Sequence, residues 1–144
     1  MTPSFDFFIK GAGKEAITQL IDEHYLQLSQ DKRELISFAI EHKSEDEFMG
    51  EEDSWACMIQ DEYGFLPDIQ VIFYPKVDQL DEAAIIAVYL IKQILNHFDG
   101  DAVLIHDFDA DMLIRRNGEI NLSSKDECWS ESLLNALAQD TRAA

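Results

Sequence analysis

Residues 112–122 have the sequence Met-Leu-Ile-Arg-Arg-Asn-Gly-Glu-Ile-Asn-Leu, in which Asn117-Gly118 separates two short runs typical of strands. A two-residue turn between antiparallel strands needs a positive φ at both central positions, and Asn-Gly tolerates this well. The segment therefore predicts a β-hairpin, with one strand over residues 112–116 and its partner over residues 119–122.

The segments that precede this hairpin predict the rest of a sheet. Residues 102–105 are continuously apolar, and Ile36, Phe38 and Ile40 alternate with polar or small residues, which predicts a strand with one buried face. Further strands are expected at residues 4–9, 55–60 and 69–74, because these runs are rich in aromatic and β-branched residues.

Three helices are expected beside these strands. The longest is predicted to begin at Asp78, as its N-cap, and to end near His97. Its centre is apolar on nearly every side, so we expect it to be buried as the spine of the core. Apolar residues at helical spacing predict a second helix over residues 14–29 and a third that carries Trp129, Leu133 and Leu137.

The expected order of elements is β-α-β-β-β-α-β-β-β-α. This order is neither a strict βα alternation nor an all-strand pattern. The sequence therefore predicts an α+β fold: a single domain over residues 1–144, with a mainly antiparallel sheet and about three helices packed on one face of it. The length agrees with this, since single domains usually contain about 100–150 residues.

The charge of the chain is its most unusual property. Eleven Lys and Arg oppose 29 Asp and Glu, which gives a formal net charge of -18. Solubility of a small domain needs only roughly 2–8 charges in magnitude. Direct binding of nucleic acid or of an anionic membrane is disfavoured, because both need clustered basic residues. A basic protein partner would be attracted, although acidity that serves solubility alone explains the composition equally simply.

Targeting signals are absent from the sequence. Residues 1–10 contain no basic segment before an apolar stretch, and no run approaches the roughly 18 apolar residues that span a membrane. Cys57 and Cys128 are far apart and belong to no C-x-x-C pair, so core thiols are a simpler expectation than a disulfide. The sequence therefore predicts a cytoplasmic protein.

Signals for catalysis are weak throughout. There is no glycine-rich phosphate loop and no G-x-S-x-G elbow. The best metal candidate is the acidic set Asp107, Asp109 and Asp111. A calcium loop that began at Asp107 would need Gly and Glu at its sixth and twelfth positions, where this chain has Met112 and Gly118. We therefore expect no enzyme activity, no cofactor and no metal.

The densest acidic segment is residues 44–53, which we expect to form a solvated loop because packed like charges repel. Phe48 and Met49 lie within it, and they either fold back onto the core or form an apolar contact ringed by acids. Two further acids follow nearby in the sequence. The residues predicted to bind a partner are Glu45, Asp46, Glu47, Phe48, Met49, Glu51, Glu52, Asp53, Asp61 and Glu62.

Three pieces of the segment 63–122 resemble a known family. They are Tyr-Gly-Phe-Leu-Pro-Asp-Ile-Gln-Val-Ile-Phe at 63–73, Gly-Asp-Ala-Val-Leu-Ile at 100–105 and the hairpin 112–122. This pattern resembles bacterial immunity proteins that accompany polymorphic toxins, particularly the swarming-inhibition type. The resemblance covers a little under half of the chain, and residues 1–60 carry no piece of it. The link at 106–111 is longer and more acidic than the family pattern.

The resemblance implies an antitoxin that binds and neutralises a cognate toxin. It carries over no functional residue, because family members bind different toxins through varied surfaces. The acidic charge separately favours a basic toxin such as a nuclease, whose active site carboxylates could block in place of phosphates. Two alternatives stay open at the level of sequence: an adaptor or chaperone for a secreted effector, and a small metal-binding enzyme that uses residues 106–111.

Overall fold

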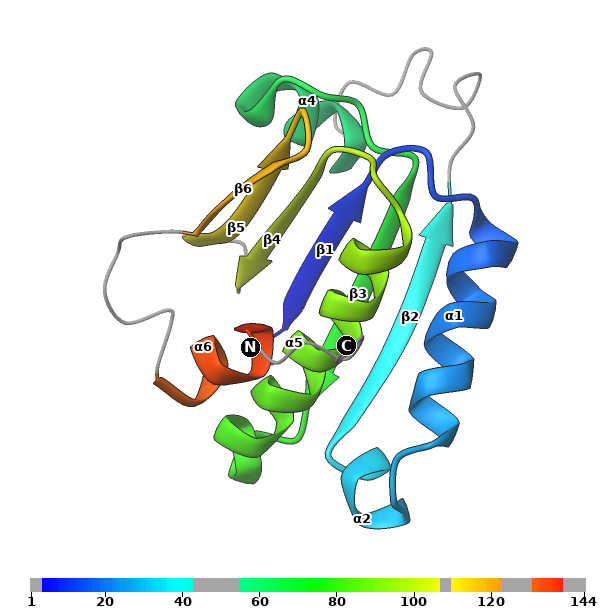
Figure 1. The fold of residues 1–144 in the computed structure, drawn as a ribbon, viewed down its shortest axis with the longest axis vertical. Coiled ribbons are helices and arrows are strands. Elements are labelled where there is room, and N and C mark those ends of the chain that lie inside the picture. Colours follow the sequence, from blue (N-terminus) through cyan, green and yellow to red (C-terminus); the bar gives the residue numbers. More distant parts are fainter. Residues whose placement is uncertain (1–3, 43–54, 107–109, 123–130, 139–144) are drawn as a thin grey trace.

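The computed structural model describes residues 4–42, 55–106, 110–122 and 131–138 (Figure 1). Within them, six strands form one sheet in the order β2-β3-β1-β4-β5-β6, and every neighbouring pair is antiparallel. The strands are β1 (Phe5–Ile9), β2 (Ile36–His42), β3 (Ile69–Pro75), β4 (Ala102–His106), β5 (Ala110–Arg116) and β6 (Glu119–Leu122). The helices are α1 (Lys14–Leu26), α2 (Gln30–Arg33), α4 (Trp55–Tyr63), α5 (Leu80–His97) and α6 (Glu131–Ala138). The predicted α+β fold with an antiparallel sheet is confirmed.

The main core lies between one face of the sheet and the helices α1, α5 and α6. Successive strand residues point to opposite faces, so Phe5, Phe7 and Ile9 of the central strand β1 all face this layer. Figure 1 shows α1 and α5 side by side over the sheet, and α6 packs against α5. Eleven of the 18 residues of α5 are buried, which confirms the prediction that this helix is the spine of the core.

The start of α5 differs from the prediction. Asp78 is not the N-cap, because residues Val77–Gln79 form a 3-10 turn and the helix begins at Leu80. The backbone N–H of Gln79 donates to the carbonyl of Lys76 at 3.0 Å, which closes this turn. Asp81 and Glu82 still lie in the first helical turn, where their charges favour the positive end of the helix dipole.

The segment 55–60 was predicted as a strand, and this prediction is wrong, because the chain forms helix α4 there. Buried Ala56 and Ile59 are three residues apart and half-buried Tyr63 follows four later, which is helical spacing. Trp55 and Ile59 favour a strand by composition, but the spacing of the buried residues follows the period of a helix.

Helix α4 also shows that the helices do not all lie on one face of the sheet. Ile59 packs in a second, smaller core with Phe8, Val103 and Ile105, which lie on the face opposite to α5. Phe65, just beyond the helix, belongs to the same core. We call this side of the sheet the α4 face.

The hairpin between β5 and β6 is confirmed as predicted. Asn117 has a φ of 52° and Gly118 a φ of 82°, so both central residues adopt the left-handed conformation that the turn needs. Arg116 is paired with Glu119 at the end of the hairpin. This turn lies at the same end of the sheet as α4 (Figure 1).

Candidate protein-binding surface

The structure describes two of the residues predicted to bind a partner. Asp61 and Glu62 are exposed on the last turn of α4 rather than in a link between two strands. The other eight lie outside the described residues: Glu45, Asp46, Glu47, Phe48, Met49, Glu51, Glu52 and Asp53. The structure does describe both elements that bound this acidic segment, since β2 ends at His42 and α4 begins at Trp55.

Helix α4 has one face on the sheet and one face in solvent. Ile59 is 1% exposed in the small core, whereas Met58 is 43% exposed. Asp61 and Glu62 follow Met58 by three and four residues, so the three side chains share the outward face. Sequence reasoning missed Met58 because the segment was assigned to a strand, although the helical spacing of Ala56, Ile59 and Tyr63 was available as a signal.

Arg116 joins the end of α4 to the sheet. Its Nη1 donates to the carbonyl oxygen of Tyr63, the last residue of the helix. Its Nε lies 3.3 Å from Oδ2 of Asp101, and its guanidinium carbon lies 5.7 Å from the centroid of the Phe65 ring. The other carboxylate oxygen of Asp101 accepts from the backbone N–H of Asn117 at 3.0 Å. We call this set of contacts the Arg116 clasp.

Gly64 has no side chain, and this absence provides space for the guanidinium group of Arg116. Its φ of +82° ends the helix in a conformation that side chains other than glycine rarely adopt. A Cβ at this position would lie 2.8 Å from Nη1 of Arg116. Glycine at the end of α4 therefore allows both the turn and the approach of the guanidinium group.

The side chain of Arg115 lies on the opposite face of the sheet from that of Arg116, because successive side chains of a strand point to opposite faces. It donates from Nη1 to the Leu95 carbonyl at 2.7 Å, from Nη2 to that of Phe98 at 2.6 Å and from Nε to that of Gly100 at 2.9 Å. These bonds cap the C-terminal end of α5, where carbonyl groups lack helical partners. Burial lowers the pKa of Arg115, while the nearby charges of Asp99 and Asp101 raise it.

The three pieces of sequence that carry the family resemblance thus meet in space. Arg115 and Arg116 of the hairpin contact Gly100 and Asp101 of the second piece, and Arg116 also contacts the first piece at Tyr63 and Phe65. These contacts fix a helix end, a turn and a hairpin. The motif residues therefore have a structural role at this site.

The phenol of Tyr63 has a strongly raised pKa. Partial burial, the negative charges of Asp111 and Glu62 and a side-chain hydrogen bond with Glu62 together raise its pKa to about 12, and burial is the largest of these causes. The group therefore stays protonated at neutral pH. A phenol held in this form is a poor proton donor or acceptor for catalysis near neutrality.

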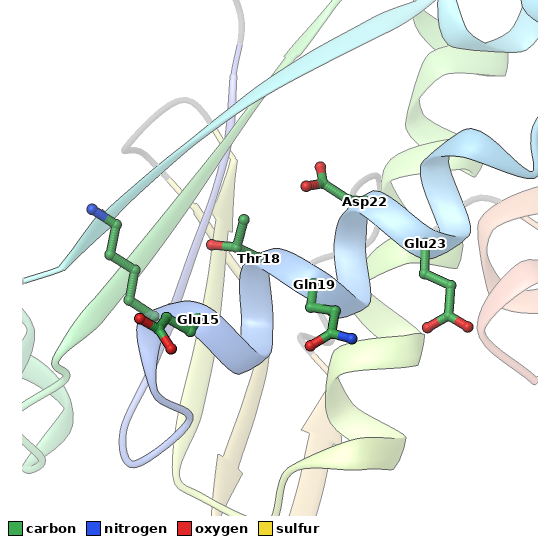
Figure 2. A pocket seen from close by; sticks show the side chains of 6 residues that line it. Glu15, Thr18, Gln19, Asp22 and Glu23 are labelled. Atoms are coloured by element: carbon green, nitrogen blue, oxygen red, sulfur yellow. The ribbon is translucent and has the colours of Figure 1, made fainter.

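The outer face of α1 forms a broad, open depression (Figure 2). The residues that line it are Lys14, Glu15, Thr18, Gln19, Asp22 and Glu23. They form two rows with a spacing of four residues along a single helix, and none of them is buried. The depression therefore provides an exposed polar surface along one helix.

The described residues contain neither a metal-binding cluster nor a membrane-spanning helix. Among residues 4–42, 55–106, 110–122 and 131–138, no group of three or more His, Cys, Asp or Glu side chains could hold a metal ion. Asp107 and Asp109 of the metal candidate lie outside the described residues, whereas Asp111 is paired with Ile105 across the β4–β5 ladder. No helix in the described segments is long and apolar enough to cross a membrane.

These features define the chain as a small acidic α+β domain whose antiparallel sheet carries helices on both faces. The chain belongs to the SitI3-like family, whose model matches residues 26–133. The SitI proteins are swarming or self-identity immunity proteins, so the membership agrees with an immunity protein family. The match extends beyond the pieces at 63–122 and includes part of the N-terminal 60 residues. Neither the curated proteins nor the solved structures gave a match.

Proposed function

We propose that this protein is an immunity protein that binds a cognate bacterial toxin in the cytoplasm and neutralises it by protein–protein contact. Membership of the SitI3-like family over residues 26–133 carries the proposal. The roles of Arg115 and Arg116 support it, because the motif residues stabilise the fold and leave binding to the surface. On this proposal the protein acts without catalysis.

We further propose that the toxin is basic, for example a nuclease domain. The net charge of -18 would attract such a partner over long distances and speed encounter. The proposed contact surface is the acidic segment from Glu45 to Asp53, with Phe48 and Met49 as apolar anchors, together with Asp61 and Glu62. The exposure of Asp61 and Glu62 on the helix that follows this segment supports the assignment.

Co-expression with the toxin tests the proposed function. The gene directly upstream of this chain's gene is expressed from an inducible promoter, with and without the chain, and surviving cells are counted. We expect survival only with the chain, and a complex of equal stoichiometry in size-exclusion chromatography. Cell death in the presence of excess folded chain, without a complex, would exclude the proposed role. A bound secretion component without a toxic domain would favour an adaptor.

A triple charge reversal tests the acidic segment. Changing Glu51, Glu52 and Asp53 to Lys should slow association with the toxin at low salt, because attraction is replaced by repulsion. The melting temperature should stay unchanged if the segment is solvated. An unchanged association rate would remove this segment from the interface while leaving the proposed function intact.

A further inference from the structure

The outward face of α4 carries exposed side chains. Met58 is 43% exposed, and Asp61 and Glu62 are exposed beside it. Protein interfaces have an apolar centre and a polar rim. Met58 and the two acids beside it could occupy these two positions in an interface. The sheet side of the same helix is anchored in the small core through Ile59. The two faces of α4 are therefore different in character and only one of them is needed for folding.

The charge of this face is not balanced within the helix. Helix α4 contains Asp61 and Glu62 but no Lys or Arg. Arg116, which contacts the end of α4, directs its guanidinium to the Tyr63 carbonyl, the Asp101 carboxylate and the Phe65 ring. The acids of α4 therefore form a negatively charged surface. A basic segment of a partner protein would be electrostatically complementary to it.

The Arg116 clasp holds this face in one orientation. It joins the last residue of α4, Tyr63, to Asp101, which directly precedes β4, and to Asn117 in the β5–β6 turn. A surface that is already ordered before binding loses less conformational entropy when a partner docks. The contacts of Arg116 are with Tyr63, Phe65 and Asp101, so Arg116 would affect binding through the position of α4.

We propose that Met58, Asp61 and Glu62 form a preformed docking surface for a basic segment of the cognate toxin, and that Arg116 is the positioning residue that holds it. This inference rests on the proposed function. Met58 is the apolar anchor, and the two carboxylates select basic side chains of the toxin. In the sequence, the acidic segment that ends at Asp53 precedes α4.

Two matched pairs of variants test the docking surface. The chain contains a second exposed Asp-Glu pair, Asp22-Glu23 on α1, so D61N/E62Q and D22N/E23Q remove the same charges from different helices. Binding of each to the purified, catalytically inactivated toxin domain is measured by surface plasmon resonance at low salt. We expect at least about a tenfold weaker affinity for D61N/E62Q and less than about a twofold change for D22N/E23Q. The variant Met58→Ala should also weaken binding.

The outcomes separate this inference from the proposed function. Failure of the unmodified chain to bind the toxin would overturn both. Normal binding by the unmodified chain with equal losses in the two pairs would overturn the docking surface alone, since it would show a general effect of net charge. Normal binding by D61N/E62Q would overturn it as well.

A double-mutant cycle tests the positioning role of Arg116. Arg116→Lys keeps a positive charge near Asp101 but cannot reproduce the planar contacts of guanidinium, and it preserves the fold better than removal of the side chain. We expect Arg116→Lys to weaken toxin binding several-fold in the unmodified chain and to have no further effect in D61N/E62Q. Additive losses would show that Arg116 acts elsewhere and would overturn its positioning role.

Discussion

Two consecutive arginines stabilise opposite faces of the sheet. Arg115 is 5% exposed and its three hydrogen bonds satisfy carbonyls at the end of α5. Arg115→Met should lower the free energy of unfolding by about 3 kcal/mol, because charged hydrogen bonds are lost and buried carbonyls keep no partner. Urea denaturation measures this. The control Lys14→Met, at an exposed position of α1, should change it by less than about 0.5 kcal/mol.

Equal, small effects of Arg115→Met and Lys14→Met would contradict the capping role of Arg115. The sequence alone did not reveal this role. The Arg-Arg pair of the hairpin was recognised as part of a family pattern, but the carbonyls that it satisfies lie 15 to 20 residues away in the chain. Such partners are set by the packing of α5 on the sheet.

Tyr63 should make stability depend on pH in alkaline solution. Its pKa is about 12 in the folded state against 10.0 for an ordinary phenol. The unfolded chain therefore loses this proton first, and the stability that Tyr63 provides is present below pH 10 and lost as the pH rises towards about 12. Urea denaturation of the unmodified chain and of Tyr63→Phe should show a difference that shrinks across this range. Parallel pH profiles would contradict the assignment.

Most elements could be predicted because their patterns are local. The hairpin was visible in Asn117-Gly118, and the buried helix α5 in its continuous apolar centre. Helix α4 could not be recognised by composition, because a short apolar run is compatible with a strand or a helix. The face of the sheet on which α4 packs is also set by residues far away in the sequence. Phe8 and Val103, from two neighbouring strands, form the small core in which Ile59 packs.

The packing of α4 can be tested by a pair of neighbouring substitutions. Alanine favours helices, so Ile59→Ala leaves helix propensity intact and removes contacts in the small core. It should lower the free energy of unfolding by about 2–5 kcal/mol, whereas Met58→Ala should change it by less than about 0.5 kcal/mol. Chemical denaturation gives both values. Similar losses for the two variants would mean that α4 does not separate a buried from an exposed face.

At the scale of the whole molecule, the sequence predicted an acidic binding protein but not the arrangement of its surface. Net charge and the acidic runs are properties of composition, and the basic partner that they favour stays a prediction. The outward grouping of Met58 with Asp61 and Glu62 depends on helical geometry and on the Arg116 clasp. Both arise only when β4, β5 and α4 meet.

The net charge of -18 should give salt two opposite effects on this protein. Excess negative charge repels itself in the compact state, and salt screens this over a Debye length of about 10 Å at 0.1 M. Raising NaCl from about 0.05 to about 0.5 M should therefore increase the free energy of unfolding. The same change should slow association with a basic toxin by about tenfold or more, because screening removes the long-range attraction. Stopped-flow mixing and urea denaturation at matched salt concentrations measure the two effects. An association rate that stays constant while stability rises would show that the toxin surface is not basic, and would leave the acidity of the chain to serve solubility.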